Sequence, residues 1–202
     1  MFKAFIHGFL LALGLILPLG VQNVFIFNQG ANRPDFRQAI PAIVVAALCD
    51  TLLILLAVLG VSVLVLKLSW LRHTLTWVGI VFLGYMGWVT WRSQPGGEAD
   101  QDQSDWSLKR LILFTASISL LNPHAILDTI GVIGTSSLQY NGTAKIAFTT
   151  ACIIVSWVWF LSLATFGRVL RTADATGRAR LVLNKVSAVI IWASAGYLLV
   201  GR

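Results

Sequence analysis

Two carboxylic acids lie inside long apolar stretches of this 202-residue chain. Asp50 stands in ALCDTLLI and Asp128 in AILDTIG, and no Lys or Arg lies in the central part of either stretch. Burying an uncompensated carboxylate is costly. Each Asp must therefore be protonated, face water or a polar pocket, or meet a cation that comes from outside the protein. A hydrogen bond between packed helices is the purely structural alternative.

His124 precedes Asp128 by four residues, so the two side chains share one face of a helix. Together with Asp50 they could relay a proton, and a hydrogen-bonded packing histidine is the alternative. One nitrogen ligand is too few for a transition-metal site, so we expect no metal and no cofactor. The sequence lacks HExxH, GxSxG and GxGD motifs, which argues against an enzyme.

Prolines interrupt two of the apolar stretches at matching places, and polar residues flank both interruptions. The stretch LGLILPLGVQNVFIFNQG contains Pro18, Gly20, Gln22 and Asn23, and the stretch SISLLNPHAILDTIGVIG contains Asn122 and Pro123. A broken membrane helix frees backbone amides and carbonyls that can bind a solute. We therefore expect the two breaks to form one site, although a proline kink can also serve shape alone. We expect four serines to bond backbone carbonyls or to allow close packing: Ser117, Ser119, Ser156 and Ser162.

The composition requires a lipid environment for the helices that carry these groups. Apolar residues make up 57% of the chain and charged residues 11%, against about 25% charged residues in soluble domains. The mean hydropathy is +0.80. The net charge of +7 arises from basic residues in the gaps between apolar stretches, which is typical of membrane topology signals rather than of a nucleic-acid surface.

Six apolar stretches are long enough to cross a bilayer, which takes about 20 residues. They cover roughly 4–27, 38–66, 71–91, 111–133, 146–167 and 182–201. Five crossings, with the last stretch on the surface, is the alternative. We predict one all-α transmembrane domain over 1–202, with a polar linker at about 92–110 in its middle.

This linker divides the helices into three plus three. Because three is odd, the second half must enter the membrane opposite to the first, as in the inverted repeats of many transporters. Ten of the fifteen Lys and Arg residues lie in the gaps after the first, third and fifth helices. Positive residues concentrate on the cytoplasmic side, so we expect both termini outside.

Three segments together resemble the LysE family of basic amino-acid exporters, and its arginine-exporter branch in particular. They are PLGVQNVFIFNQG, the Asp50 region and LLNPHAILDTIGVIGT, of which NPHxxLDT is the most specific. Val21 departs from that branch, in which proline is expected. The resemblance implies six helices and ATP-independent export across the bacterial cytoplasmic membrane by a multi-pass secondary transporter. Carried onto this chain, it gives a working set of Pro18, Gln22, Asn23, Asp50, Asn122, Pro123 and Asp128.

A basic amino acid suits this set of groups. The aspartates match its cationic groups, and the broken-helix amides with Gln22, Asn23 and Asn122 match its carboxylate. Exchange for an incoming proton would offset the membrane potential, which opposes cation export. We therefore expect arginine, and also lysine, as substrates. We expect protons and membrane lipid as partners. Export of neutral amino acids of the homoserine or threonine type, or of another small cation, is the alternative, and a homo-oligomer stays open.

The topology can be tested with reporter fusions. A reporter that works only in the cytoplasm should be silent when fused after Arg202 and active when inserted at 95–105, because the linker is predicted to lie inside. Equal fusion levels on an immunoblot are the control. Activity after Arg202 would mean that the helix count is wrong by one.

Overall fold

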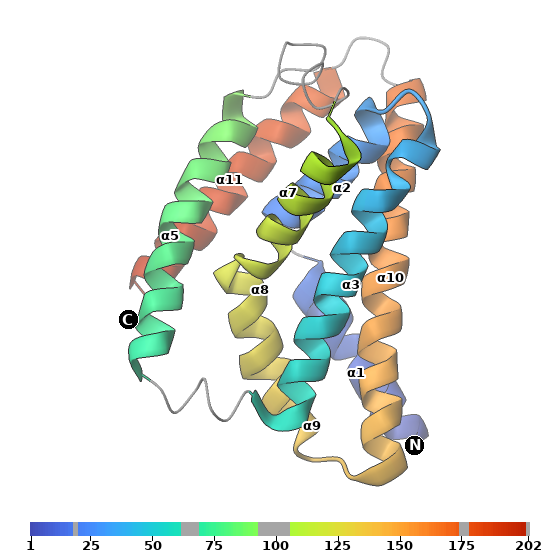
Figure 1. Ribbon diagram of the computed structural model, residues 1–202, viewed down its shortest axis with the longest axis vertical. Helices are drawn as coiled ribbons and strands as arrows, with labels where there is room; N and C mark the ends of the chain where they lie inside the picture. Colours follow the sequence, from blue (N-terminus) through green and yellow to red (C-terminus); the bar gives the residue numbers. More distant parts are fainter. Residues whose placement is uncertain (18–19, 62–68, 93–105, 174–177, 201–202) are drawn as a thin grey trace.

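The computed structural model describes residues 1–17, 20–61, 69–92, 106–173 and 178–200, and these form helices without any strand (Figure 1). Pro18 and most of the predicted linker lie outside the described residues. The helices are α1 (Phe2–Ile16), α2 (Val21–Asn32), η1 (Phe36–Gln38), α3 (Ile40–Leu56), η2 (Ala57–Val61), α5 (Ser69–Arg92), α7 (Leu108–Leu120), α8 (Pro123–Asp128), η3 (Thr129–Gly134), α9 (Thr135–Ser137), α10 (Gly142–Ala173) and α11 (Arg178–Val200).

Within the described residues, each of the six predicted stretches is helical, and the first and the fourth are interrupted where the prolines indicated. The first stretch breaks between Ile16 and Val21, and the fourth breaks between Leu120 and Pro123. The axes of α1 and α2 differ by 81°. Two segments, η2 and η3, are wound as π-helix, and η2 ends near Gly60, whose φ of 105° lies in the left-handed region that favours glycine.

Hydropathy and length identify fewer membrane crossings than the sequence predicts. Within the described ranges, two segments are long and apolar enough to span a membrane. They are Phe36–Gly60 and Gly142–Leu170, with mean hydropathies of 2.8 and 2.0 respectively. The bent pair α1 and α2 makes a third crossing if it is counted as one span. The all-helical fold class is thus confirmed, and the six-crossing arrangement stays a prediction.

Helix α10 packs along both pieces of the interrupted first stretch (Figure 1). A Cβ added at Gly8 of α1 would lie 2.5 Å from the Phe148 carbonyl oxygen, and one at Gly30 of α2 would lie 2.0 Å from the Ala164 carbonyl oxygen. These distances are shorter than any real Cβ contact. Small residues are what lets membrane helices bring their backbones together, so glycine is required at both contacts.

A second pair of helices, α5 and α11, lies side by side on one flank of the bundle (Figure 1). The Trp192 indole nitrogen donates to the Gly84 carbonyl at 3.3 Å, and the ring contacts Trp91 with centroids 5.6 Å apart. Gly87 leaves the space for this ring. Helix α3 packs against α7, the first piece of the interrupted fourth stretch, and against α10.

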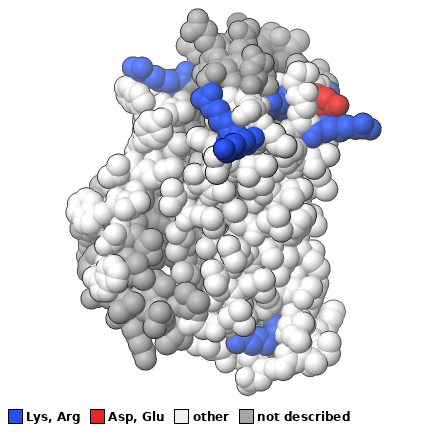
Figure 2. All heavy atoms as spheres, viewed as in Figure 1, with Lys and Arg blue, Asp and Glu red and all other residues white. Residues whose placement is uncertain are grey.

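Basic side chains gather at the end of the bundle where α2, α5 and α10 finish and α7 begins (Figures 1 and 2). This end carries Arg33, Arg37, Arg92, Lys109, Arg110 and Arg168. Arg168 donates to the Arg33 carbonyl oxygen at 2.8 Å, which joins α10 to the end of α2. Lys3 and Lys145 lie near the starts of α1 and α10, at the opposite end.

The α2–α10 contact predicts a stability effect. Gly30→Ala should lower the free energy of unfolding by about 1–3 kcal/mol, because the new methyl group overlaps the Ala164 carbonyl. The thermal unfolding midpoint of the purified protein in detergent measures this. Gly14→Ala is the matched control, because Gly14 is exposed and has nothing within 4 Å of its added Cβ. Equal midpoints for the two variants would contradict the close contact.

Candidate substrate site between the helix breaks

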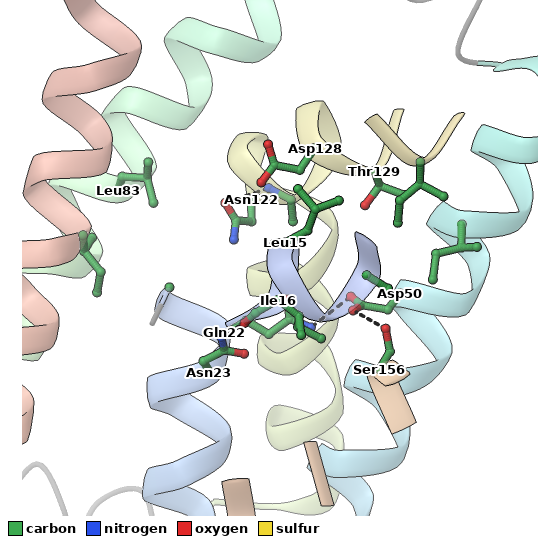
Figure 3. Close-up of a pocket in the computed structure, with 16 residues that line it drawn as sticks. Leu15, Ile16, Gln22, Asn23, Asp50, Leu83, Asn122, Asp128, Thr129 and Ser156 are labelled. Atoms are coloured by element: carbon green, nitrogen blue, oxygen red, sulfur yellow. Dashed lines mark hydrogen bonds between the residues drawn. The ribbon is translucent and has the colours of Figure 1, made fainter. Parts of the chain in front are cut away.

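A cavity of about 110 Å³ lies between the two helix breaks (Figure 3). That is room for a few water molecules. The predicted residues Gly20, Gln22, Asn23, Asp50, Asn122 and Asp128 all line it. The structure therefore brings both interruptions and both aspartates to one place, although they are far apart in the sequence.

Asp50 is held by side chains from two other helices. Its Oδ1 accepts from Gln22 Nε2 of α2 at 3.2 Å, and its Oδ2 accepts from Ser156 Oγ of α10 at 3.2 Å (Figure 3). Asp50 itself lies in the middle of α3 and is partly exposed to the cavity. A carboxylate oxygen can accept more than one hydrogen bond, so both oxygens keep acceptor capacity toward the cavity.

The first break is braced by Asn23. Its Nδ2 donates to the carbonyl oxygen of Ile16, the last residue of α1, at 2.8 Å. Its Oδ1 accepts from the indole nitrogen of Trp159 on α10 at 3.3 Å. Gly20 precedes α2 in an extended conformation, and the first amide groups of a helix have no partner within that helix. The break therefore offers amide donors beside the cavity.

The second break is built around Asn122. Its Oδ1 accepts from the Ala125 amide at 3.5 Å, at the start of α8, and its side chain is buried. Asp128 ends α8 and is partly buried. Figure 3 shows Asp128 and Asn122 on one wall of the cavity and Asp50 with Ser156 on another. The two carboxylates thus lie at separate places around one small space.

Some predicted residues lie outside what the structure describes. Pro18 is one, and the side chains of Pro123 and His124 are others, although Pro123 opens α8. The relay of Asp50, His124 and Asp128 therefore stays a prediction. Among the described residues, no three His, Cys, Asp or Glu side chains come together in a way that could hold a metal ion.

The bond expected from Ser156 to a backbone carbonyl was wrong. Ser162 donates to the Val158 carbonyl as expected, but Ser156 donates to Asp50. A serine in a membrane helix has a local carbonyl available, so its type alone could not reveal this contact. The sequence did offer one signal. Ser156 follows Asp50 by 106 residues, and Pro123 follows Pro18 by 105, so Ser156 stands in the second half at nearly the position that Asp50 has in the first.

Comparison with known proteins decides the family. Residues 13–202 match the family described as LysE type translocator. The chain belongs to the LysE family. The resemblance seen in its motifs is thereby confirmed, and the protein is a membrane transporter of the translocator type rather than an enzyme family member.

Relatives cover nearly the whole chain. A Bacillus subtilis (strain 168) protein named "Putative amino-acid transporter YisU" is 56% identical over 96% of this chain and 88% of its own length. Proteins named arginine exporter protein ArgO from Pectobacterium carotovorum and Escherichia coli (strain K12) are 33% and 30% identical. Each alignment with these exporters covers 95% of this chain, and 94% and 91% of the relative respectively. No solved structure matches this LysE family member significantly.

The shared cavity predicts parallel behaviour of the two breaks. Cysteines at Gly20 and Asn122 should both react with a small thiol reagent, and arginine should protect both, because both positions line one space. Labelling rates with and without arginine measure this. The native Cys49 and Cys152 are buried and are first replaced by Ala. An exposed cysteine at Gln139 should react without protection, and protection of only one break would contradict a common site.

Proposed function

We propose that this protein exports basic amino acids, arginine foremost and lysine second, from the cytoplasm across the bacterial cytoplasmic membrane. The observation that carries the proposal is the Asp50 carboxylate, which borders the cavity between the breaks. The described lining contains two carboxylates and neither Lys nor Arg. A cationic solute is the natural complement of such a lining, and two relatives are named as arginine exporters.

The cavity supplies complements to each charged group of arginine. Asp50 receives the guanidinium, because its oxygens keep acceptor capacity toward the cavity. Asp128, on another wall, receives the α-amino group. The α-carboxylate binds at the breaks, where the amides that open α2 and the side chains of Gln22 and Asn122 supply donors. Asn23 contributes by fixing the geometry of the first break, since it bonds Ile16 and Trp159.

Proton exchange would drive this export. The membrane potential opposes outward movement of a cation by about 2.3 kcal/mol per charge per 100 mV. An entering proton carries the compensating charge, and a cavity aspartate that releases the substrate can accept it. We therefore assign Asp50 and Asp128 as candidate proton carriers, with His124 as a further member of the relay.

We propose that the chain is one domain of six crossings, arranged as a 3+3 inverted repeat. Packing supports this. The contact of α3 with α7 is equivalent, in the other half, to the contacts of α10 with α1 and α2. In addition, α5 packs with its equivalent α11, and α3 packs with its equivalent α10. Two hydrogen bonds between α3 and α10 join residues 106 apart, from Ser156 to Asp50 and from Trp157 to Thr51. Contact between equivalent positions is what a twofold axis between these helices requires.

The distribution of basic side chains gives the orientation that we propose. The end with the larger group of basic side chains is assigned to the cytoplasm, and both termini to the outside.

A neutral amino acid is the second candidate substrate. Much of the lining is aliphatic, with Leu15, Ile16, Leu83 and Ile133 among its residues, and this favours an apolar side chain. The relative at 56% identity is named only for amino acids in general. Uptake of labelled arginine, lysine and threonine into inverted membrane vesicles, with and without a pH gradient, distinguishes the candidates. Threonine uptake without arginine uptake would overturn the proposal.

The role of Asp50 gives a sharp test. Asp50→Asn should reduce arginine export by more than about tenfold, equivalent to about 1.4 kcal/mol, because the amide keeps the size but loses the charge. Folding should be retained, since a buried charge is costly. Labelled arginine export at matched membrane expression measures this.

Asp35→Asn is the matched control for this substitution. Asp35 is exposed beside η1 and accepts from the Arg37 amide, which an asparagine oxygen can also do, so export should be unchanged. Near-normal export by Asp50→Asn would remove Asp50 from the site. Loss of membrane expression together with export would make its role structural.

A further inference from the structure

We propose that Ser156 is a positioning residue that makes the site prefer a guanidinium over an ammonium group. The inference rests on the proposed export of basic amino acids and deepens it by assigning the discrimination between arginine and lysine. It starts from the two hydrogen bonds that fix the Asp50 carboxylate, one from Gln22 and one from Ser156.

Ser156 departs from the behaviour of three other hydroxyl residues on its own helix. Thr149, Ser162 and Thr165 each donate to the backbone carbonyl four residues earlier, at 2.7–2.8 Å. Ser156 also has a backbone carbonyl four residues earlier in its helix, yet its hydroxyl donates to Asp50 Oδ2 on α3. Its side chain is buried, and it lines the cavity beside Asp50.

The helix that carries Ser156 is joined to α3 by a second hydrogen bond beside Ser156. The next residue, Trp157, donates to Thr51 Oγ1 at 3.2 Å, and Thr51 Oγ1 donates to the Ala47 carbonyl at 2.7 Å. Two adjacent residues of α10 thus bond two adjacent residues of α3. The direction from which Ser156 approaches Asp50 is therefore fixed by the contact between the two helices.

One donor on each oxygen fixes the plane of the carboxylate. Gln22 reaches Oδ1 from α2 and Ser156 reaches Oδ2 from α10, so rotation about the last side-chain bond would break both contacts. Each oxygen retains acceptor capacity for a ligand in the cavity. The carboxylate is thereby presented in one orientation before the substrate arrives.

A fixed carboxylate plane matters more for arginine than for lysine. A guanidinium is a planar fork that binds both oxygens at once and needs the two groups nearly coplanar. An ammonium is a compact charge with three rotatable donors and can follow a rotating carboxylate. Loss of the Ser156 hydroxyl should therefore weaken arginine binding selectively.

The test is Ser156→Ala, with labelled arginine and labelled lysine uptake measured separately into inverted vesicles at subsaturating concentrations. Arginine uptake should fall about five- to tenfold, which is the value of one hydrogen bond. Lysine uptake should fall by less than about twofold. Ser156→Thr keeps the hydroxyl and should restore the arginine-to-lysine ratio.

Ser162→Ala is the matched control, since Ser162 lies on the same helix and bonds only a local carbonyl in the structure. It should leave the ratio unchanged. Uptake is normalised to folded protein measured by size exclusion in detergent, so a folding defect cannot imitate selectivity. An equal fall for both substrates, or an unchanged ratio in Ser156→Ala, would overturn the role of Ser156. Failure of the wild-type protein to transport either substrate would overturn the proposed function instead.

Discussion

The close contact of α10 with both pieces of the interrupted first stretch is the constraint on which the site depends. A helix that stops inside a membrane exposes amides and carbonyls that lipid cannot satisfy. Here Gly8 and Gly30 let the backbones approach α10 directly, and Trp159 reaches from α10 into the break through Asn23. The interruption is therefore tolerated because it is enclosed by protein, and its polar residues line the cavity instead of facing lipid.

The same enclosure explains how an aspartate persists at the middle of an apolar helix. Asp50 lies where α2 and α10 meet α3, and each neighbour contributes one donor to its carboxylate. These bonds use part of the hydrogen-bonding capacity of the carboxylate, and the rest is directed to the cavity that Asp50 lines. An ion pair within the protein would instead have neutralised the charge and left nothing for a cationic substrate to complement.

The sequence was most informative where a residue type has few uses in lipid. Asp50, Gln22 and Asn122 were predicted to lie together, and all three line the cavity. The reason is that polar side chains and proline breaks in apolar stretches are costly when they face lipid, so they are expected to gather at one polar site. Ser156 and Trp159 were not recognised, because serine and tryptophan are common in membrane helices and their partners are distant in sequence. Helix ends were also missed: the fifth stretch continues to Ala173, since polar residues can extend a helix beyond the bilayer.

The π-wound segments η2 and η3 pack against each other, with Ala57 and Ile130 in one apolar cluster. A π turn holds one residue more than an α turn, so it is a local excess of chain. Taking up that excess would turn the residues beyond it by about 100° and move them by about 1.5 Å along the axis. Thr129 and Ile133, which belong to η3, line the cavity. Backbone winding, as well as helix position, therefore determines which side chains line the cavity.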